Sequence, residues 1–246
     1  KLYDYRKTRT RLHKDDKVLT SWNALAIVAF SKAGRILSKK KYLNAAIRCA
    51  EFIESNLTDE NGDLFIRWRD GDAAHMGQLD DYAFYAWALL ELYNSTFDTG
   101  YLKKAVLICE KIIDYFLDKE RGGLYLYSIK SEKLLIRPKE TYDAAMPSGN
   151  SVAALVFDKL FKLTGDIKWK DRTKEQLDFL ASSAKSYPAG HSVALTAMIS
   201  SESPSYELVI VTDDEFPSGA EKLFKSYFFN LTTLLKNKQN AHELAM

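Results

Sequence analysis

Gly77-Gln-Leu-Asp-Asp-Tyr-Ala-Phe-Tyr-Ala-Trp-Ala-Leu-Leu90 is the stretch that decides the fold, because two adjacent carboxylates open a segment that is apolar on nearly every side. A helix that is hydrophobic all round must be covered by neighbours on all sides. Asp80 and Asp81 therefore stand where a buried helix reaches a surface or a cavity. We expect the rest of the chain to supply the covering helices.

Composition restricts the classes of partner. The chain has 246 residues, of which 46% are hydrophobic, so it has enough apolar side chains for one large core or two small ones. Its 35 basic and 33 acidic residues leave a net charge of +2, which gives no electrostatic footprint for nucleic acid or for a membrane surface. No run approaches the roughly 20 apolar residues of a membrane span. We expect small molecules or proteins as partners.

The two cysteines and the first residues indicate the cellular context. Cys49 and Cys109 fall at apolar positions of helical patterns, as reduced thiols of a cytoplasmic protein do. No Cys/His spacing typical of a metal site occurs, and we expect neither a metal nor a cofactor. The chain begins with Lys1 and has no initiating Met, which suggests a start inside a longer parent.

Two kinds of helical pattern alternate along the chain. One is apolar on all faces and predicts inner helices; the other has a single apolar stripe, as in helices that cover a core from outside. The inner helices are expected at 22–30, 79–92, 151–163 and 190–199, and the outer ones at 42–53, 101–116 and 168–184. Gly-led extended pieces at 63–68 and 122–127 separate the repeats. Such hairpins must stack or close into a ring, so the pattern predicts a mainly α fold, a partial (α/α) toroid with half of its ring absent.

The tail changes character and predicts a small α/β element. Residues 207–212 and 231–235 read as β-branched strands, with a helix from Pro217 to about residue 228 between them. A right-handed βαβ unit with a parallel strand pair is the simplest connection. We therefore expect a helical domain at 1–203 and a tail packed on it at 204–246.

Four motifs resemble one known family along nearly the whole chain. They are Asp15-Asp16-Lys17-Val-Leu-Thr-Ser-Trp22-Asn23, Leu79-Asp80-Asp81-Tyr82-Ala83, Arg137-Pro-Lys139-Glu140-Thr-Tyr-Asp143 and Pro147-Ser148-Gly149-Asn150-Ser151. In this order they are similar to the C-terminal half of the YyaL and spermatogenesis-associated protein 20 family of thioredoxin-domain-containing proteins. The resemblance implies an N-terminal thioredoxin-like domain elsewhere in the parent. It also implies an (α/α)6 region similar to six-hairpin glycosidases and N-acylglucosamine 2-epimerase.

The polar starts of the inner helices are expected to gather around one mouth of the toroid, which is the default position for a ligand site. Glycoside hydrolysis requires two carboxyl groups across the scissile bond, and we take Asp16, Asp80 and Asp81 as catalytic candidates. The ligand-binding candidates are Asp15, Trp22, Asn23, Tyr82, Arg137, Lys139, Glu140, Asp143, Ser148, Asn150 and His191.

Each candidate also has a structural interpretation. An Asp or Ser at a helix start is a natural cap, the basic and acidic residues at 137–143 can form salt bridges that fix their loop, and aromatic residues at helical spacing belong to cores. A single His caps or packs more often than it transfers protons. Two hypotheses remain open: a glycosidase-like or epimerase-like domain that binds a sugar, and a non-catalytic scaffold that serves the thioredoxin-like domain. Under either, the fragment should contact the N-terminal half of its parent, and alone it should self-associate through its uncovered apolar flanks.

Overall fold

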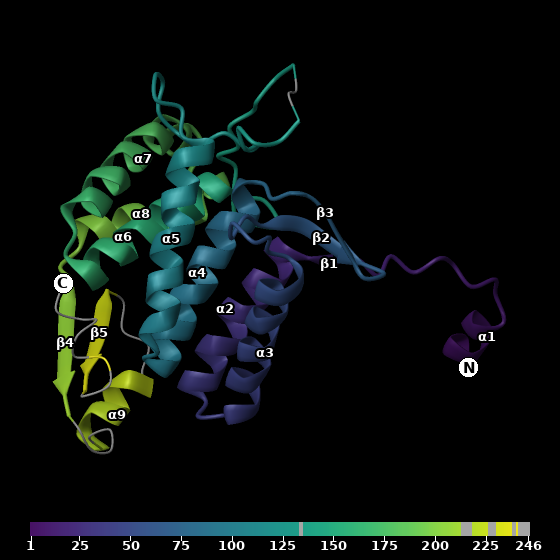
Figure 1. The fold of residues 1–246 in the computed structure, drawn as a ribbon, viewed down its shortest axis with the longest axis horizontal. Coiled ribbons are helices and arrows are strands. Elements are labelled where there is room, and N and C mark those ends of the chain that lie inside the picture. The colour runs from purple at the N-terminus through teal and green to yellow at the C-terminus, as the bar shows by residue number, and fades with distance from the viewer. Residues whose placement is uncertain (133–134, 213–217, 226–229, 238–239, 241–246) are drawn as a thin grey trace.

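The computed structural model describes residues 1–132, 135–212, 218–225, 230–237 and 240, and it is built of two curved layers of helices (Figure 1). The inner layer consists of α2 (Thr20–Ile36), α4 (Leu79–Thr96), α6 (Gly149–Thr164) and α8 (Ser192–Glu202). The outer layer consists of α3 (Lys40–Asn56), α5 (Thr99–Phe116) and α7 (Ile167–Ser186), and a short α1 (Leu2–Lys7) lies on a projecting arm. The predicted alternation of inner and outer helices is confirmed, with each helix somewhat longer than expected.

The two layers differ in burial as their sequence patterns predict. In α4 nearly every residue from Leu79 to Tyr93 is buried, because α2, α5 and α6 pack around it. In α5 burial follows a stripe, and the predicted inward positions Leu102, Cys109 and Phe116 are among its buried residues. Each inner helix packs mainly on the next inner helix and on the outer helix that follows it. The core is therefore a continuous apolar layer between the two sets of helices.

A small antiparallel sheet lies beside the first hairpin. It consists of β1 (Val18–Leu19), β2 (Phe65–Arg69) and β3 (Asp72–Met76), in the order β1-β2-β3. The turn between β2 and β3 has positive φ at Asp70 (52°) and Gly71 (83°), as a tight hairpin with two left-handed residues requires. The second Gly-led segment contributes an isolated bridge between Leu117 and Leu124 in place of a strand.

The tail forms the predicted parallel unit. Strands β4 (Tyr206–Val211) and β5 (Leu231–Lys236) pair in parallel, and α9 (Ser218–Lys225) lies between them in sequence. The expected end of this helix, residues 226–228, lies outside the described residues. The α9 helix packs on α2, where Arg35 Nη1 donates a 2.9 Å hydrogen bond to the Phe224 carbonyl oxygen.

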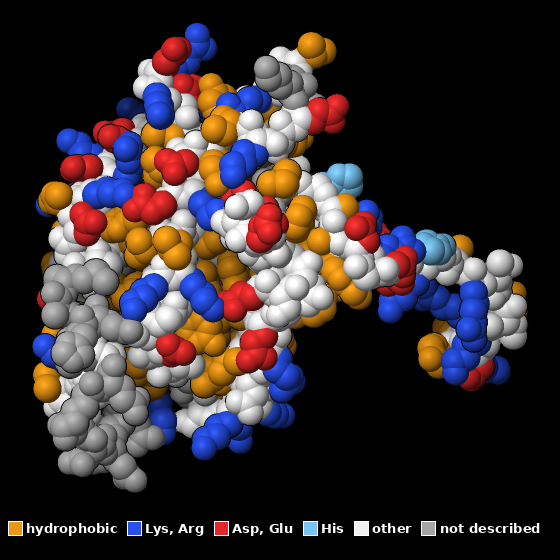
Figure 2. Space-filling model, in the orientation of Figure 1, with side chains coloured by type: hydrophobic (Ala, Val, Ile, Leu, Met, Phe, Trp, Pro, Cys, Tyr) orange, Lys and Arg blue, Asp and Glu red, His pale blue; other side chains and the backbone are white. Residues whose placement is uncertain are grey.

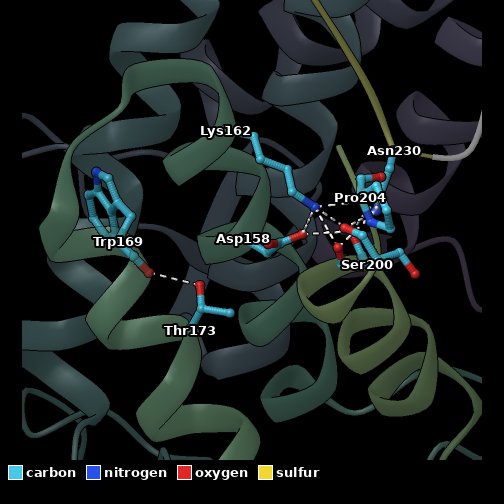
Figure 3. Close-up of polar contacts among 8 residues, drawn as sticks. Asp158, Lys162, Trp169, Thr173, Ser200, Pro204 and Asn230 are labelled. Atoms are coloured by element: carbon cyan, nitrogen blue, oxygen red, sulfur yellow. Dashed lines mark hydrogen bonds and ion pairs between the residues drawn. The ribbon is translucent and has the colours of Figure 1, made fainter. Parts of the chain in front are cut away.

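One largely buried lysine, Lys162, joins the tail to the helical layers (Figure 3). Lys162 of α6 donates to Asp158 Oδ2 at 2.7 Å, to the Ser200 carbonyl of α8 at 2.8 Å and to Asn230 Oδ1 at 3.2 Å. Ser200 Oγ adds a 2.6 Å bond to the same carboxylate. Two inner helices and the residue that precedes β5 thus all contact the ammonium group of Lys162.

The surface carries charges of both signs. Figure 2 shows acidic and basic side chains interspersed over one face, with lysine and arginine most concentrated on the N-terminal arm. Within the described ranges, no helix combines the length and the apolar character that a bilayer crossing requires.

We predict that Lys162→Met destabilises the protein by about 3–5 kcal/mol, because Asp158 would remain buried without its counter-charge. Chemical denaturation measures this change. Lys174→Met, at an exposed position of α7, is the matched control and should change the stability by less than about 0.5 kcal/mol. A loss below about 1 kcal/mol for Lys162→Met would show that the network does not hold the tail.

Candidate functional site

The N-terminal ends of α2, α4, α6 and α8 are joined to one another, and we call the region that they form the inner-helix mouth. Asp81 makes the first link, between α2 and α4. Its Oδ1 accepts a hydrogen bond from the Ser21 backbone N–H at 3.0 Å, and its Oδ2 accepts one from the Gln78 N–H at 2.8 Å. One carboxylate therefore caps two neighbouring inner helices.

Asp143 makes an equivalent link between α6 and α8. Its Oδ1 accepts from the Ser148 N–H at 2.9 Å, and its Oδ2 accepts from the N–H groups of Val193 and Ala194 at 2.8 and 3.2 Å. The loop that precedes α6 is thereby fixed to the first turn of α8.

Gly149 makes the contact between α4 and α6 through its lack of a side chain. A Cβ at this position would lie 2.6 Å from Asp80 Oδ1 and 2.7 Å from Leu79 Cγ. The first turns of the two helices therefore meet more closely than any other residue allows. With the two aspartate links, this contact brings all four inner-helix starts together.

Asp80 differs from its neighbour because its Oδ1 is buried without a hydrogen-bond partner among the described residues. Burial, with a smaller contribution from the negative charge of Glu140, raises the pKa of Asp80 to about 6, and the Gly149 N–H opposes this shift. Burial also raises the pKa of Asp81 to about 7, although both of its oxygens accept backbone hydrogen bonds. Asp81 is occupied as a cap, whereas Asp80 Oδ1 is buried against Gly149 without a hydrogen-bond partner among the described residues.

His191 has the second unpartnered polar atom of the mouth. Its Nδ1 lies 2.8 Å from the Tyr187 carbonyl oxygen, so the ring is held in place, while the buried Nε2 has no partner in the described structure. The ring of Tyr142 meets the imidazole edge to face at 6.3 Å and stacks on Tyr187 at 6.2 Å. Tyr142 was not among the predicted residues; its position between Glu140 and Asp143 is the signal that would have indicated it.

The segment 140–143 connects these groups. The charge of Glu140 acts on Asp80, the Tyr142 ring contacts His191, and Asp143 caps α6 and α8. Adjacent residues are at most about 3.8 Å apart along the chain, so Asp80 and His191 border the same short segment. The two buried polar groups of the mouth that have an unpartnered atom thus lie along one loop.

Most other predicted residues are engaged in internal bonds. Asn150 uses both ends of its amide, accepting from the Leu124 N–H and Gln176 Nε2 and donating to the carbonyls of Leu124 and Glu140. The remaining engaged side chains are Tyr82 with the Leu64 N–H, Arg137 with the Tyr127 carbonyl, Lys139 with Asp118, Ser148 with the Ser151 N–H, and Asn23 with the Leu19 carbonyl.

The first aspartate pair lies outside this network. Asp16 pairs with Arg69 Nε of β2 at 2.9 Å, and Asp15 pairs with Lys17 at 3.2 Å, all near the small sheet. The Trp22 side chain is 60% exposed at the start of α2. Over the residues that the structure describes, no group of three or more His, Cys, Asp or Glu side chains is arranged to hold a metal ion.

Solved structures share this architecture, and the chain has an (α/α)-toroid fold. Cellobiose 2-epimerase from Bacillus thermoamylovorans matches with a TM-score of 0.58 and 20% identity, over 68% of this chain and 45% of the epimerase. A family 76 α-mannanase from Bacteroides thetaiotaomicron matches with a TM-score of 0.60 and 16% identity, over 78% of this chain and 55% of the mannanase. An inactive α-1,6-mannanase variant from Salegentibacter, in complex with α-1,6-mannotriose, matches with a TM-score of 0.55 and 16% identity. The match covers 66% of this chain and 47% of the mannanase.

By sequence, the chain is a homologue of spermatogenesis-associated protein 20. The rat protein is 27% identical over 225 residues, which cover 87% of this chain and 28% of the rat protein. An uncharacterized protein of Caenorhabditis elegans is 34% identical over 183 residues, which cover 71% of this chain and 25% of that protein. The chain thus spans about a quarter of the length of these relatives. No protein-family model matches it.

We predict that Asp80→Asn stabilises the protein at neutral pH. The raised pKa of Asp80 means that the folded state binds this proton more tightly than the unfolded state, so ionisation costs stability as the pH rises from about 4 to 6. Removing the charge should add roughly 2 kcal/mol above pH 6 and almost nothing below pH 4. Thermal unfolding from pH 3.5 to 8 measures the change, with exposed Asp178→Asn as the control. A gain that does not depend on pH would contradict this origin.

Proposed function

We propose that the inner-helix mouth binds a carbohydrate or sugar-derived ligand and that Asp80 serves there as the proton donor. The observation that carries this proposal is the buried, unpartnered Oδ1 of a carboxyl group whose pKa is raised to about 6. A general acid works best when its pKa is close to the working pH. Burial, and to a smaller extent the charge of nearby Glu140, raises the pKa of Asp80, as burial and a second carboxylate do in glycosidase-type pairs.

His191 and Tyr142 complete the proposed site. The imidazole Nε2 has no hydrogen-bond partner among the described residues, and the exposed Tyr142 ring offers a flat surface of the type on which sugar rings stack. Hydrolysis requires an acid and a second carboxylate, whereas epimerisation requires a group that takes a proton from carbon. Asp80 with Glu140 fits the first chemistry, and His191 fits the second.

The comparisons support a sugar ligand. The similar folds include a cellobiose 2-epimerase and mannanases, and the inactive Salegentibacter variant has two adjacent aspartates changed to asparagine. The present chain also has adjacent aspartates at the start of an inner helix, Asp80 and Asp81. A cytoplasmic location belongs to the same proposal, because both cysteines are free thiols.

A non-catalytic scaffold is the second candidate, and a specific observation favours it. Asp81, Asp143 and Asn150, all predicted as site residues, are fully used in holding helices and loops together. A mouth built mainly for rigidity would suit a domain that presents a surface to the remainder of a longer protein.

Sugar binding and turnover distinguish these two candidates. We expect α-1,6-mannotriose or cellobiose to bind the chain with a dissociation constant in the millimolar range, measured by calorimetry. Asp80→Asn should keep this affinity within about threefold. It should lower hydrolysis or epimerisation, followed by chromatography, at least about 100-fold, because a positioned general acid contributes that much.

Asp178→Asn is the matched control and should retain both binding and turnover. The proposal fails if neither sugar binds saturably to the unaltered chain, or if Asp80→Asn turns over substrate at the original rate. If neither sugar binds saturably, the non-catalytic scaffold is the function that the structure supports.

We further propose that the isolated chain self-associates through the open flank of α2, which the remainder of the longer protein covers in its parent. Trp22 and Phe30 are exposed there, and Ile36 and Leu37 extend the apolar surface. Light scattering at 10–100 µM should show dimers or larger species, and a Trp22→Ser/Phe30→Ser variant should shift the population to monomer. A monodisperse monomer of the unaltered chain would overturn the proposal.

A further inference from the structure

Strand β4 forms the outer edge of the tail sheet. It pairs with β5, and β5 in turn packs on α6, so β4 is the strand farther from the helical layers. In Figure 1 it runs along the margin of the molecule. The side chains of Tyr206, Val209 and Val211 are 65%, 57% and 73% exposed. This edge is therefore open, although parallel strands are normally covered by further structure.

The hydrogen bonds to β5 use alternate residues of β4. The Tyr206 N–H donates to the Asn230 carbonyl oxygen at 2.9 Å, at the start of the parallel ladder. Successive residues of a strand direct their backbone groups to opposite edges. Leu208 and Ile210 therefore bond to β5 as well.

The backbone groups of the intervening residues point away from β5. These residues are Glu207, Val209 and Val211, and none of their N–H or C=O groups has a hydrogen-bond partner among the described residues. Exposed edge strands in proteins usually carry lysine, proline or a bulge that prevents pairing. The sequence of β4, Tyr-Glu-Leu-Val-Ile-Val, has none of these. A row of free donors and acceptors along an apolar strand is the template that another strand recognises.

Two charged side chains lie beside this edge. Glu207 belongs to β4, and Lys236 of β5 is paired with Val211, so both side chains point to the same face of the sheet. Both are exposed, and neither forms an ion pair within the described ranges.

We propose that β4 pairs antiparallel with β4 of a second copy of this chain, about a twofold axis at Val209, to give one continuous sheet of four strands. In this register Val209 lies opposite its counterpart, and Glu207 lies opposite Val211 of the second copy. Each outward N–H then meets an outward C=O. The contact uses the same surface on both copies, as a closed twofold interface requires.

The same register brings opposite charges together. Val211 of one copy lies between its own Lys236 and Glu207 of the second copy, all on one face. Strands two apart in a sheet are separated by about 10 Å, which a lysine and a glutamate side chain can bridge from its two ends. The two Glu207 side chains are kept about 14 Å apart. The charges therefore favour a second copy in this register.

This contact is distinct from the open flank of α2 and does not rest on the proposed sugar function. A single pair of short strands makes a small interface, and we expect a dissociation constant on the order of 0.3 mM.

Amide hydrogen exchange resolved by residue with NMR tests the proposal. The measurement uses the unaltered chain and the Trp22→Ser/Phe30→Ser variant, in which the α2 flank does not contribute. Between 50 µM and 1 mM, exchange at the three outward residues of β4 should slow at least about twofold, by mass action. Leu208 and Ile210 already bond to β5 and should not change. Sedimentation of the variant should show a dimer over the same range.

Charge reversal provides matched variants. Glu207→Lys places like charges on both sides of Val211 and should weaken dimerisation at least about threefold, and Glu207→Lys/Lys236→Glu should restore it. Lys174→Glu, at an exposed position of α7, is the control and should have no effect.

Val209→Pro removes an outward N–H and leaves the bonds to β5 in place, so the folded variant should remain monomeric at 1 mM. Circular dichroism checks the fold of each variant. Exchange at the three outward amides that does not depend on concentration overturns the proposal, as does association that disappears entirely in Trp22→Ser/Phe30→Ser. An undiminished dimer in folded Val209→Pro or Glu207→Lys would overturn it as well.

Discussion

The structure depends on backbone N–H groups at the starts of four inner helices that find acceptors on neighbouring segments. Each helix start leaves several N–H groups unsatisfied, and their burial without partners would cost more than a helix of this length gains from its own propensity. The carboxylates of Asp81 and Asp143 each accept hydrogen bonds from backbone N–H groups at two helix starts. The same bonds fix the relative positions of the helices, and so they define the mouth.

Adjacent aspartates therefore have different roles at one helix start. Both oxygens of Asp81 accept hydrogen bonds from backbone N–H groups at the starts of α2 and α4. Asp80 instead lies against Gly149 of α6, and its buried Oδ1 has no hydrogen-bond partner among the described residues. A protein that needed only a cap would have one carboxylate here. The second carboxylate is buried at a cost in stability, which the surrounding packed helices offset.

Periodicity was sufficient to predict the fold, because a helix apolar on all sides has few ways to be covered. The site was less predictable. Asn150 and Asp143 occur in motifs typical of a site, and in the structure both side chains bond to backbone groups of segments distant in sequence. Sequence spacing carries no information about such bonds. Conversely, Glu91 within an apolar helix was a visible signal of a buried charge, but Lys32 and Lys159, which pair with it, lie on other helices and could not be assigned to it.

The order of packing along the chain has a kinetic consequence. Each inner helix packs chiefly on the inner helix next to it in sequence and on the outer helix that follows. Contacts between segments close in sequence require little loop closure, so folding can begin at any hairpin and extend by one repeat at a time. During synthesis on the ribosome, each new hairpin would thus pack on a preceding hairpin that has already folded. The tail, which joins α6 and α8 through Lys162, docks after both of these helices have formed.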